Sequence, residues 1–409
     1  MVHYLYMTSA PYDNGVYQTQ VLDWLNLYRT KGVDFTLIQF FPVHPSLLKK
    51  SKKDKESIRK AYNGKSKFYW RLPQQILPSY INKVIFLRAV RPFLKKEDDR
   101  VVIFSRSHIA KEIEYLRHHY PNRVTYYYDL RGAFPEEYRD TLKYKNSFGK
   151  QTCRILGDIY FSSFCCQKEA DKIFAVSKPL MDYYEDTFGT GRNKFVLYPC
   201  LSTITKFYYD KQIREKTRKE LGFNDSDDVF IYSGGLDYSY SFVEEFVDLF
   251  KQALQVNKNA KLLVLAKKIT PNFLSIVENN PDVKSRLKTV ENIPNSMMIN
   301  YLNAADIGFL LRNNTLLNNV ASPVKFAEYQ LCGLPVIISE AVLDYSIYCI
   351  KHHSGVVLSN KDFENKDFSF VANITKDCFD RQQVADDARI NLSKEMVVDT
   401  IVESIKVDK

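Results

Sequence analysis

A lysine and a glutamate three residues apart mark the stretch of this chain that is best suited to binding an anion. Lys325 and Glu328 belong to "SPVKFAEYQLCGLPVI" (322–337), which the pattern predicts to be a short helix followed by a buried strand. The two side chains share one helix face, about 4.5 Å apart along the axis. Free N–H groups and the positive dipole end attract an anion, and Lys325 adds a full charge.

Glu328, one turn deeper, is a pure hydrogen-bond acceptor and is suited to a pair of hydroxyl groups. A phosphate at the helix start with a diol one turn further on describes the ribose-diphosphate part of a nucleotide. An ordinary surface ion pair on a capped helix is the alternative that the local pattern leaves open.

The limits of this helix are also predicted. Ser322 is a good N-cap, and Pro323 suits the first helical position, where its missing N–H costs nothing. Gly333 is suited to the left-handed turn that ends a helix, and Pro335 prevents the helix from resuming. The apolar run at 336–338 then predicts a buried strand.

The first half of the chain alternates between strands and helices. An apolar strand at 2–7, a helix up to Gly32 and a strand at 33–41 form a β-α-β unit, which implies parallel pairing. Further strands are expected at 100–108 and 123–132, and "KIFAVSKPLMDYY" (172–184) predicts a strand, a serine and a helix. Ligands of open α/β sheets bind at the carboxyl ends of strands. Those ends carry polar or glycine residues: Asp13–Gly15, Arg106–His108, Asp129–Gly132 and Ser177–Lys178.

The alternation restarts after a break near 196–203. A basic helix "KQIREKTRKELGF" leads to a strand that ends at Gly234 and Gly235, and a helix–strand pair is expected at 297–314. The sequence thus predicts an α/β protein of two alternating halves. The expected division is an N-terminal domain at 1–200, a second domain at 201–380, and C-terminal helices at 381–409 that pack back towards the N-terminal domain.

Charge and composition restrict the partners. Residues 1–200 hold 33 lysines and arginines against 20 acidic residues, whereas the remainder holds 25 against 28. The surplus gathers at 47–60 and 81–96, where basic and apolar residues mix, so either an anionic membrane surface or a solvated helix face explains it. Nucleic acid is not expected, because no nucleic-acid-binding motif is found. Seven cysteines without paired spacing, no apolar run long enough to span a membrane and no signal peptide favour a reduced, cytoplasmic setting.

The motifs resemble those of glycosyltransferase family four. "SPVKFAEYQLCGLPVI" is similar to the family's Ser-Pro-x-Lys-x-x-Glu-Tyr pattern, and "YLNAADIGFLLR" resembles the segment that precedes it. "YYDLRGAFPEE" is similar to an Asp-x-Arg-Gly segment of many members, and the resemblance spans roughly residues 1–340. It implies the GT-B fold, in which two Rossmann-like α/β domains face each other across a cleft. It also implies retaining transfer of a sugar from a nucleotide-sugar, held by the second domain, to an acceptor against the first.

The resemblance carries roles onto donor-side residues. Glu328 matches the glutamate that takes the ribose hydroxyls, and Lys325 matches the lysine near the diphosphate, with Ser322 at the motif's start. Gly234 and Gly235 match small residues that let backbone approach phosphate closely. A leaving diphosphate needs its charge balanced, and other members place an Arg and a Lys directly after the glycines. Because "LDYSYSF" (236–242) has no cation, Lys325, Arg312 and Lys267 are the candidates.

Other positions depart from the family pattern or match it weakly. Many members have a glutamate where this chain has Val320. His108 lies where relatives often have a histidine against the donor sugar, and a structural histidine is the alternative. Asp129 and Arg131 are assigned to the acceptor side, although an internal ion pair explains them equally well. Gly15 is the single glycine of the first loop, where relatives often have two.

The expected activity is therefore that of a retaining, hexosyltransferase-type enzyme in surface polysaccharide or glycolipid synthesis, peripheral at the inner membrane face. The acceptor would be a glycan or a lipid-linked molecule. No cofactor beyond the nucleotide-sugar co-substrate is expected, and no metal, since no Asp-x-Asp motif occurs. The alternatives are a catalytically inactive glycosyltransferase-like partner subunit and a GT-B sugar-nucleotide epimerase.

Overall fold

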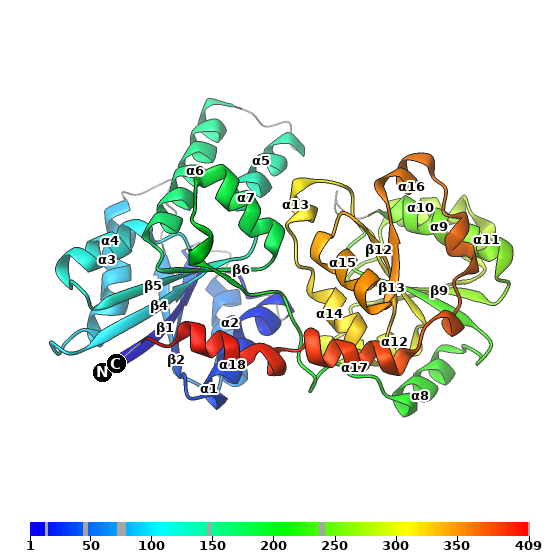
Figure 1. The fold of residues 1–409 in the computed structure, drawn as a ribbon, viewed down its shortest axis with the longest axis horizontal. Coiled ribbons are helices and arrows are strands. Elements are labelled where there is room, and N and C mark those ends of the chain that lie inside the picture. Colours follow the sequence, from blue (N-terminus) through cyan, green and yellow to red (C-terminus); the bar gives the residue numbers. More distant parts are fainter. Residues whose placement is uncertain (13–14, 44–47, 72–78, 145–148, 237–241, 408–409) are drawn as a thin grey trace. The chain divides into compact units, whose positions relative to one another are not determined.

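The computed structural model describes the chain except residues 13–14, 44–47, 72–78, 145–148, 237–241 and 408–409 (Figure 1). The chain divides into two compact units. The N-terminal unit comprises Met1–Pro199 and Val398–Lys409, and the C-terminal unit comprises Cys200–Val397. The sequence-based limits were drawn at residues 200 and 380, so the segment 381–397 lies in the C-terminal unit.

The N-terminal unit is built on a seven-stranded sheet in the order β3-β2-β1-β4-β5-β6-β7. Every neighbouring pair is parallel. The strands are β1 (Val2–Thr8), β2 (Phe35–Pro42), β3 (Ser66–Arg71), β4 (Arg100–Ser105), β5 (Val124–Leu130), β6 (Lys172–Ala175) and β7 (Phe195–Leu197). The helices are α1 (Asp23–Thr30), α2 (Leu48–Ala61), α3 (Ser79–Val90), α4 (Ala110–His119), α5 (Phe134–Tyr144), α6 (Lys150–Glu169) and α7 (Lys178–Phe188).

The strand order of this sheet fixes where a ligand can approach. The chain first adds strands on one side of β1 and then returns to add β4 on the other, so the order reverses between β1 and β4. Helices that leave these two strands diverge onto opposite faces and open a crevice at the carboxyl ends of the strands. The strands predicted at 2–7, 33–41, 100–108 and 123–132 are all confirmed, the last two ending earlier, at Ser105 and Leu130.

The helix after β1 contains a wide turn. A π-helical segment η1 (Gln18–Leu22) precedes α1, and the Thr19 N–H donates to the Gly15 carbonyl at 3.0 Å. Single π-turns inside α-helices are frequent at functional sites. The helix predicted to end at Gly32 is confirmed, and Gly32 adopts a left-handed φ of 81°.

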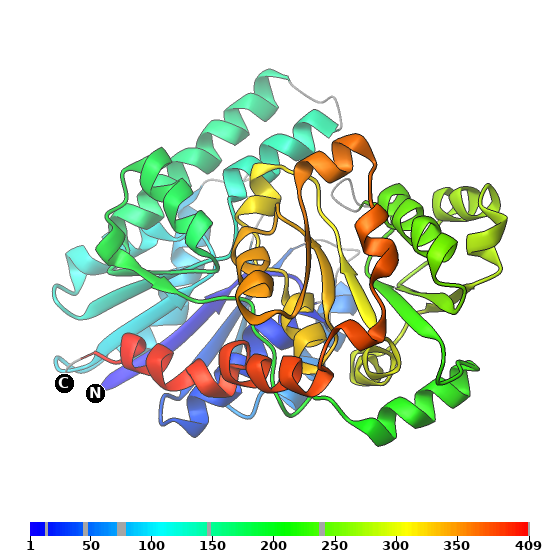
Figure 2. The same ribbon diagram turned by 45° about the vertical axis from the view of Figure 1, so that its right-hand side comes forward.

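The C-terminal unit is built on a six-stranded parallel sheet in the order β10-β9-β8-β11-β12-β13, with helices on both faces (Figure 2). Its strands are β8 (Asp228–Ser233), β9 (Ala260–Ala266), β10 (Leu287–Glu291), β11 (Ile307–Leu310), β12 (Val336–Ser339) and β13 (Gly355–Leu358). Its helices are α8 (Lys211–Leu221), α9 (Val243–Val256), α10 (Pro271–Glu278), α11 (Pro281–Lys284), α12 (Met298–Ala304), α13 (Leu316–Asn319), α14 (Val324–Leu331), α15 (Leu343–His352), α16 (Asn360–Asn365) and α17 (Arg381–Asn391). The final helix, α18 (Lys394–Ile405), begins in this unit and ends in the N-terminal unit.

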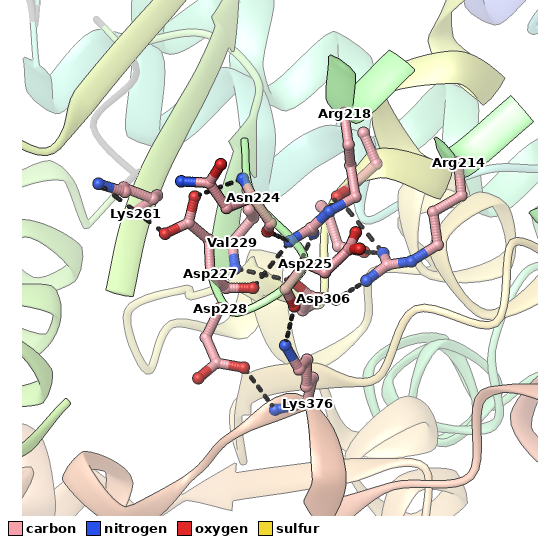
Figure 3. Close-up of polar contacts among 12 residues, drawn as sticks. Arg214, Arg218, Asn224, Asp225, Asp227, Asp228, Val229, Lys261, Asp306 and Lys376 are labelled. Carbon is pink, nitrogen blue, oxygen red and sulfur yellow. Dashed lines mark hydrogen bonds and ion pairs between the residues drawn. The ribbon is translucent and has the colours of Figure 1, made fainter. Parts of the chain in front are cut away.

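A buried ionic cluster attaches α8 to this sheet (Figure 3). The fully buried Asp306, just before β11, receives Arg214 at 2.5 Å and Arg218 at 2.9 Å. The Val229 N–H of β8 donates to the same carboxylate at 2.8 Å. The basic helix predicted from "KQIREKTRKELGF" is therefore confirmed, and two of its arginines fix it to the core.

The helix that carries the Lys-Glu pair starts later than predicted. Pro323 is the residue before α14, which begins at Val324 and has no side-chain cap hydrogen bond. The prediction that Ser322 caps the helix is wrong, because its hydroxyl accepts the Cys200 N–H at 3.0 Å and lies 2.8 Å from the Tyr345 hydroxyl. The predicted end is confirmed, since Gly333 has a φ of 63°. The strand predicted at 336–338 is β12.

The two basic stretches of the N-terminal unit form α2 and the region from α3 onwards. Phe86, Leu87 and Leu94 turn into the core, whereas Val84 remains 45% exposed. The apolar content of this stretch therefore serves the core for the most part. Within the described residues, no helix is both long and apolar enough to cross a membrane.

Candidate functional site

The carboxyl edge of the C-terminal sheet brings together most of the residues predicted to bind the donor. Its strand order reverses between β8 and β11, which is where ligands bind in open α/β sheets. Gly234 and Gly235 directly follow β8, Arg312 follows β11, and Lys267 follows β9. The connection from β11 to β12 contains α14 with Lys325 and Glu328.

Lys325 reaches from α14 to the end of β8. Its ammonium donates to the Ser233 carbonyl at 2.5 Å and lies against Gly234. A Cβ added at Gly234 would meet the Lys325 Nζ at 2.5 Å, which is closer than real contacts allow. The missing side chain of Gly234 therefore makes room for the lysine. The sequence had predicted only that it makes room for a phosphate.

Two cations lie close together here. Burial and the nearby Arg312 lower the pKa of Lys325 to about 8, against the partial opposing effect of Glu328. Arg312 is held by its backbone N–H, which donates to the Ser339 hydroxyl at 2.8 Å. Like charges brought together in a half-buried site favour an anion between them.

Glu328 is 8% exposed and raises a different electrostatic problem. Burial raises its pKa to about 7, although Lys325, Lys394 and Lys206 each act to lower it. Within the described residues its carboxylate has no hydrogen bond or ion pair at contact distance. A buried acceptor without donors is suited to a ligand that brings hydroxyl groups. Lys206 and Lys394 were not predicted, since nothing in the sequence relates them to residue 328.

The remaining donor-side predictions lie at varying distances from this cluster. The Gly235 carbonyl accepts the Tyr232 hydroxyl at 2.7 Å, and Val320 is buried beside the helix. Lys267 is exposed at the end of β9. The hydroxyl of Ser322 is engaged by Cys200 and Tyr345. Most of the loop 236–242, which was expected to lack cations, falls outside the described residues.

The N-terminal unit has a cavity of about 980 Å³ at its own switch point. Residues after β1, β4 and β5 line one part, and α5 and α6 line the other. The predicted residues His108, Asp129 and Arg131 all line it. Several lining residues were not predicted: Ser9, Arg71, Phe134, Glu137 and Arg154.

Asp129 organises the floor of this cavity. Its fully buried carboxylate accepts the Tyr6 hydroxyl at 2.7 Å and the Arg106 Nε at 2.9 Å, and Arg131 lies 3.4 Å away. Gln20, from the π-turn, accepts from both arginines, through its carbonyl at 3.0 Å and its side chain at 2.6 Å. The carboxylate of Asp129 thus holds two arginines at the cavity, which favours the internal ion pair among the two interpretations of this motif. Gln20 could be identified as part of this site only from the π-helical turn that contains it, and the sequence does not predict that turn.

His108 is neutral at physiological pH. Burial and the nearby Arg71 lower its pKa to about 4. Its Nε2 lies 2.8 Å from the Tyr128 hydroxyl, and its ring meets Phe134 edge-on with centroids 5.2 Å apart. A neutral imidazole in this position is suited to hydrogen bonding with a sugar hydroxyl and is not suited to acid catalysis.

Gly15 lies in the first loop, and Arg71 lies at the end of the edge strand β3. A Cβ added at Gly15 would meet nothing within 4 Å, so no described neighbour requires glycine there. Arg71, the last residue of β3, contacts the Ser9 hydroxyl at 3.4 Å. Burial lowers the pKa of its guanidinium, and Glu112 partly offsets this.

Across the part of the chain that the structure describes, no three His, Cys, Asp or Glu side chains gather closely enough to hold a metal ion. All seven cysteines are free thiols.

Two parallel sheets of seven and six strands, each with interleaved helices and one reversal of strand order, define the class of the molecule: it has the GT-B fold, with two Rossmann-like units. No family model matches the sequence, and no curated protein matches it either. The fold is therefore established by solved structures.

Three solved structures illustrate the similarity. The lipopolysaccharide outer core galactosyltransferase WaaB superposes with a TM-score of 0.65 at 12% identity, covering 99% of each chain. Sucrose-phosphate synthase from Thermosynechococcus elongatus gives 0.63 at 12% identity, covering 98% of each chain. Anabaena HepE in complex with UDP gives 0.62 at 12% identity, covering 98% of this chain and 99% of the other.

Proposed function

We propose that this protein is a glycosyltransferase that moves a sugar from a nucleotide-sugar to a glycan or lipid-linked acceptor. The observation that carries the proposal is the α14 cluster: a lysine and an arginine at a sheet switch point, with a buried, unsatisfied carboxylate one turn away. That geometry matches a nucleoside diphosphate. Solved structures of the same fold include HepE with UDP and with UDP-glucose, and the transferases WaaG and WaaB.

The donor side assigns a task to each residue of the cluster. Lys325 and Arg312 balance the diphosphate charge that grows as the sugar leaves, with Lys267 as a further candidate at the β9 end. Glu328 accepts hydrogen bonds from the ribose hydroxyls, and Ser322, Gly234 and Gly235 shape the surrounding backbone. Occupation of the site relieves the crowding of Lys325 against Arg312.

The acceptor side is the cavity of the N-terminal unit. Its arginines, hydroxyls and neutral His108 provide directional hydrogen bonds for a saccharide, and Phe134 supplies an apolar face. We assign His108 to the transferred sugar, and Asp129, Arg131 and Gly15 to the structure around the acceptor. His108, with a pKa near 4, donates or accepts without taking a proton at neutral pH.

The finer features of the reaction are part of the proposal. We propose family-four membership and retention of configuration, with the leaving phosphate helping to deprotonate the acceptor hydroxyl. Transfer of a hexose without a metal ion follows from the same resemblance. The setting is the cytoplasm, supported by the seven free thiols, with attachment to an anionic membrane surface through the outward lysines of α2.

A panel of UDP, GDP, CMP, ADP and dTDP in a thermal-shift titration tests the donor site. Stabilisation by one of them, abolished in Glu328→Ala and retained in Glu364→Ala, is the expected result, because residue 364 is exposed and remote in sequence. If no nucleotide stabilises the protein, an inactive partner subunit becomes the better explanation. If one nucleotide does stabilise the protein, release of free sugar from the matching nucleotide-sugar would exclude the inactive subunit, and inversion of the donor sugar without transfer would indicate the epimerase.

A further inference from the structure

A second cavity lies at the edge of the N-terminal sheet and has no part in the proposed reaction. It measures about 710 Å³ and is formed by α2, the edge strand β3 and α3. Its lining contains no acidic residue. Its charged and aromatic lining residues lie on both sides of β3, because successive side chains of a strand point to opposite faces of the sheet. Lys55, Arg59, Phe68 and Trp70 lie on the α2 side, and Lys67, Tyr69 and Arg88 lie on the α3 side.

Three of the four cations, Lys55, Arg59 and Lys67, lie against aromatic rings. Among the described residues, none of the four has a carboxylate partner within ion-pair distance. The Lys55 Nζ lies 4.5 Å from the Trp70 ring centroid, and the Arg59 guanidinium lies 5.1 Å from that of Phe68. The Lys67 Nζ lies 4.3 Å from the Phe93 ring. Cation–π contacts fix these charges without neutralising them, so an incoming anion orders few side chains.

The pKa of Lys67 also indicates that the cavity suits an anion. Burial lowers the pKa of Lys67, and repulsion by Lys65 lowers it further. Such a shift means that the protonated lysine lacks compensating negative charge in the protein alone. An anionic ligand would supply that charge.

Strand β3 connects this cavity to the one at the switch point. Ser66 to Trp70 line the edge cavity, and the next residue, Arg71, lines the other. Six residues of strand extend about 17 Å. Both cavities therefore lie along one continuous, half-exposed strand within the same unit.

We infer that the edge cavity, here called the β3 groove, binds the distal part of an acidic glycan chain whose end occupies the switch-point cavity. The inference rests on the proposed function and specifies its acceptor class. Cations on both sides of a half-exposed edge strand suit a chain that runs along the strand, whereas a flat membrane would meet the outward lysines of α2. Aromatic rings beside the cations suit a ligand with apolar ring faces between its charges.

Calorimetric titration of the full-length protein with hexagalacturonate tests the inference, with neutral maltohexaose as the matched ligand. The variant Lys55→Gln/Arg59→Gln removes two charges from the groove. The control Lys49→Gln/Lys52→Gln removes two exposed charges from the same helix outside the groove lining. We expect hexagalacturonate to bind at least tenfold more tightly than maltohexaose. The groove variant should lose tenfold or more, and the control less than threefold.

Three results would overturn the inference: no binding of hexagalacturonate, equal losses in both variants, or equal affinity for the neutral chain. Phosphatidylglycerol vesicles form a separate arm, and loss of vesicle binding in the groove variant alone would mark a lipid site instead. Size-exclusion chromatography checks that the variants stay monodisperse, since cations on an edge strand also oppose strand pairing. The nucleotide-induced thermal shift reports on the donor site independently, so failure here leaves the proposed function standing.

Discussion

At the scale of single residues, the cluster on α14 is notable for two buried charges that are not paired with each other. Lys325 and Glu328 share a helix face, yet their pKa values move towards neutrality, to about 8 and about 7, because burial outweighs their mutual attraction. Strongly perturbed groups in a crevice are candidates for function, since a purely structural pair would be placed in contact. The local sequence identified this pair, but it did not predict the burial that shifts the two pKa values.

The stability of the protein should depend on pH through Glu328. Its pKa rises from an ordinary 4.5 to about 7 on folding, so the native state binds the proton more tightly than the unfolded state. The contribution of this group to stability is then present below pH 4.5 and is lost as the pH rises through 7. Glu328→Gln should therefore gain stability relative to wild type between pH 5 and pH 8, by at most about 3 kcal/mol.

Urea unfolding at four pH values across this range measures the effect. The exposed Glu364→Gln provides the control and should show a difference that does not change with pH. A Glu328→Gln difference that is equally flat would show that the carboxylate is not stressed by burial.

A methyl group at Gly234 should displace the flexible end of the Lys325 side chain. Gly234→Ala places a Cβ 2.5 Å from the Lys325 Nζ, so the ammonium must leave the Ser233 carbonyl. We expect nucleotide affinity to fall about tenfold, which corresponds to about 1.4 kcal/mol. Gly157→Ala is the control, because an added Cβ there meets nothing within 4 Å. Unchanged nucleotide affinity in Gly234→Ala would separate this contact from binding.

At the scale of elements, the alternation of apolar strands and amphipathic helices was sufficient to predict the strands named from the sequence and the order of most helices. The start of α14 was not predictable, because the Ser322 hydroxyl can bond either to the backbone of its own helix or to residues distant in sequence. The pattern favours a cap, but the chain brings Cys200 and Tyr345, distant in sequence, to its hydroxyl. Likewise the basic character of α8 suggested nothing of the buried carboxylate that its arginines meet.

The link between α8 and the sheet should be essential for the stability of the C-terminal unit. Asp306→Asn removes the charge that compensates Arg214 and the almost fully buried Arg218 (Figure 3). Breaking a buried pair on one side costs about 3–5 kcal/mol. Denaturant unfolding of the variant beside the exposed Asp225→Asn measures this cost. A loss below 1 kcal/mol would mean that the backbone carbonyls around Arg218 suffice to hold it.

At the scale of the whole molecule, the resemblance in sequence and the similarity in structure agree on the fold while sharing little identity. Twelve per cent identity to WaaB, across nearly the entire chain, keeps the architecture and few side chains. Residues that the sequence could not nominate, such as Arg71 and Gln20, acquire their positions only through long-range contacts. The Lys325–Glu328 motif could be predicted from the sequence, because its geometry depends only on the helix that carries it.

The path of the chain has a final consequence, because α18 returns the C-terminus to the N-terminal unit. In topological terms, residues 200–397 are inserted between two segments of one host unit, Met1–Pro199 and Val398–Lys409. Buried Val398, Ile401, Val402 and Ile405 complete it, each contributing about 1.5–3 kcal/mol if fully buried. A fragment 1–199 should therefore be markedly less stable than the same fragment joined by a short linker to 398–407, as thermal unfolding would show. Equal melting temperatures would mean that the host is complete without its tail.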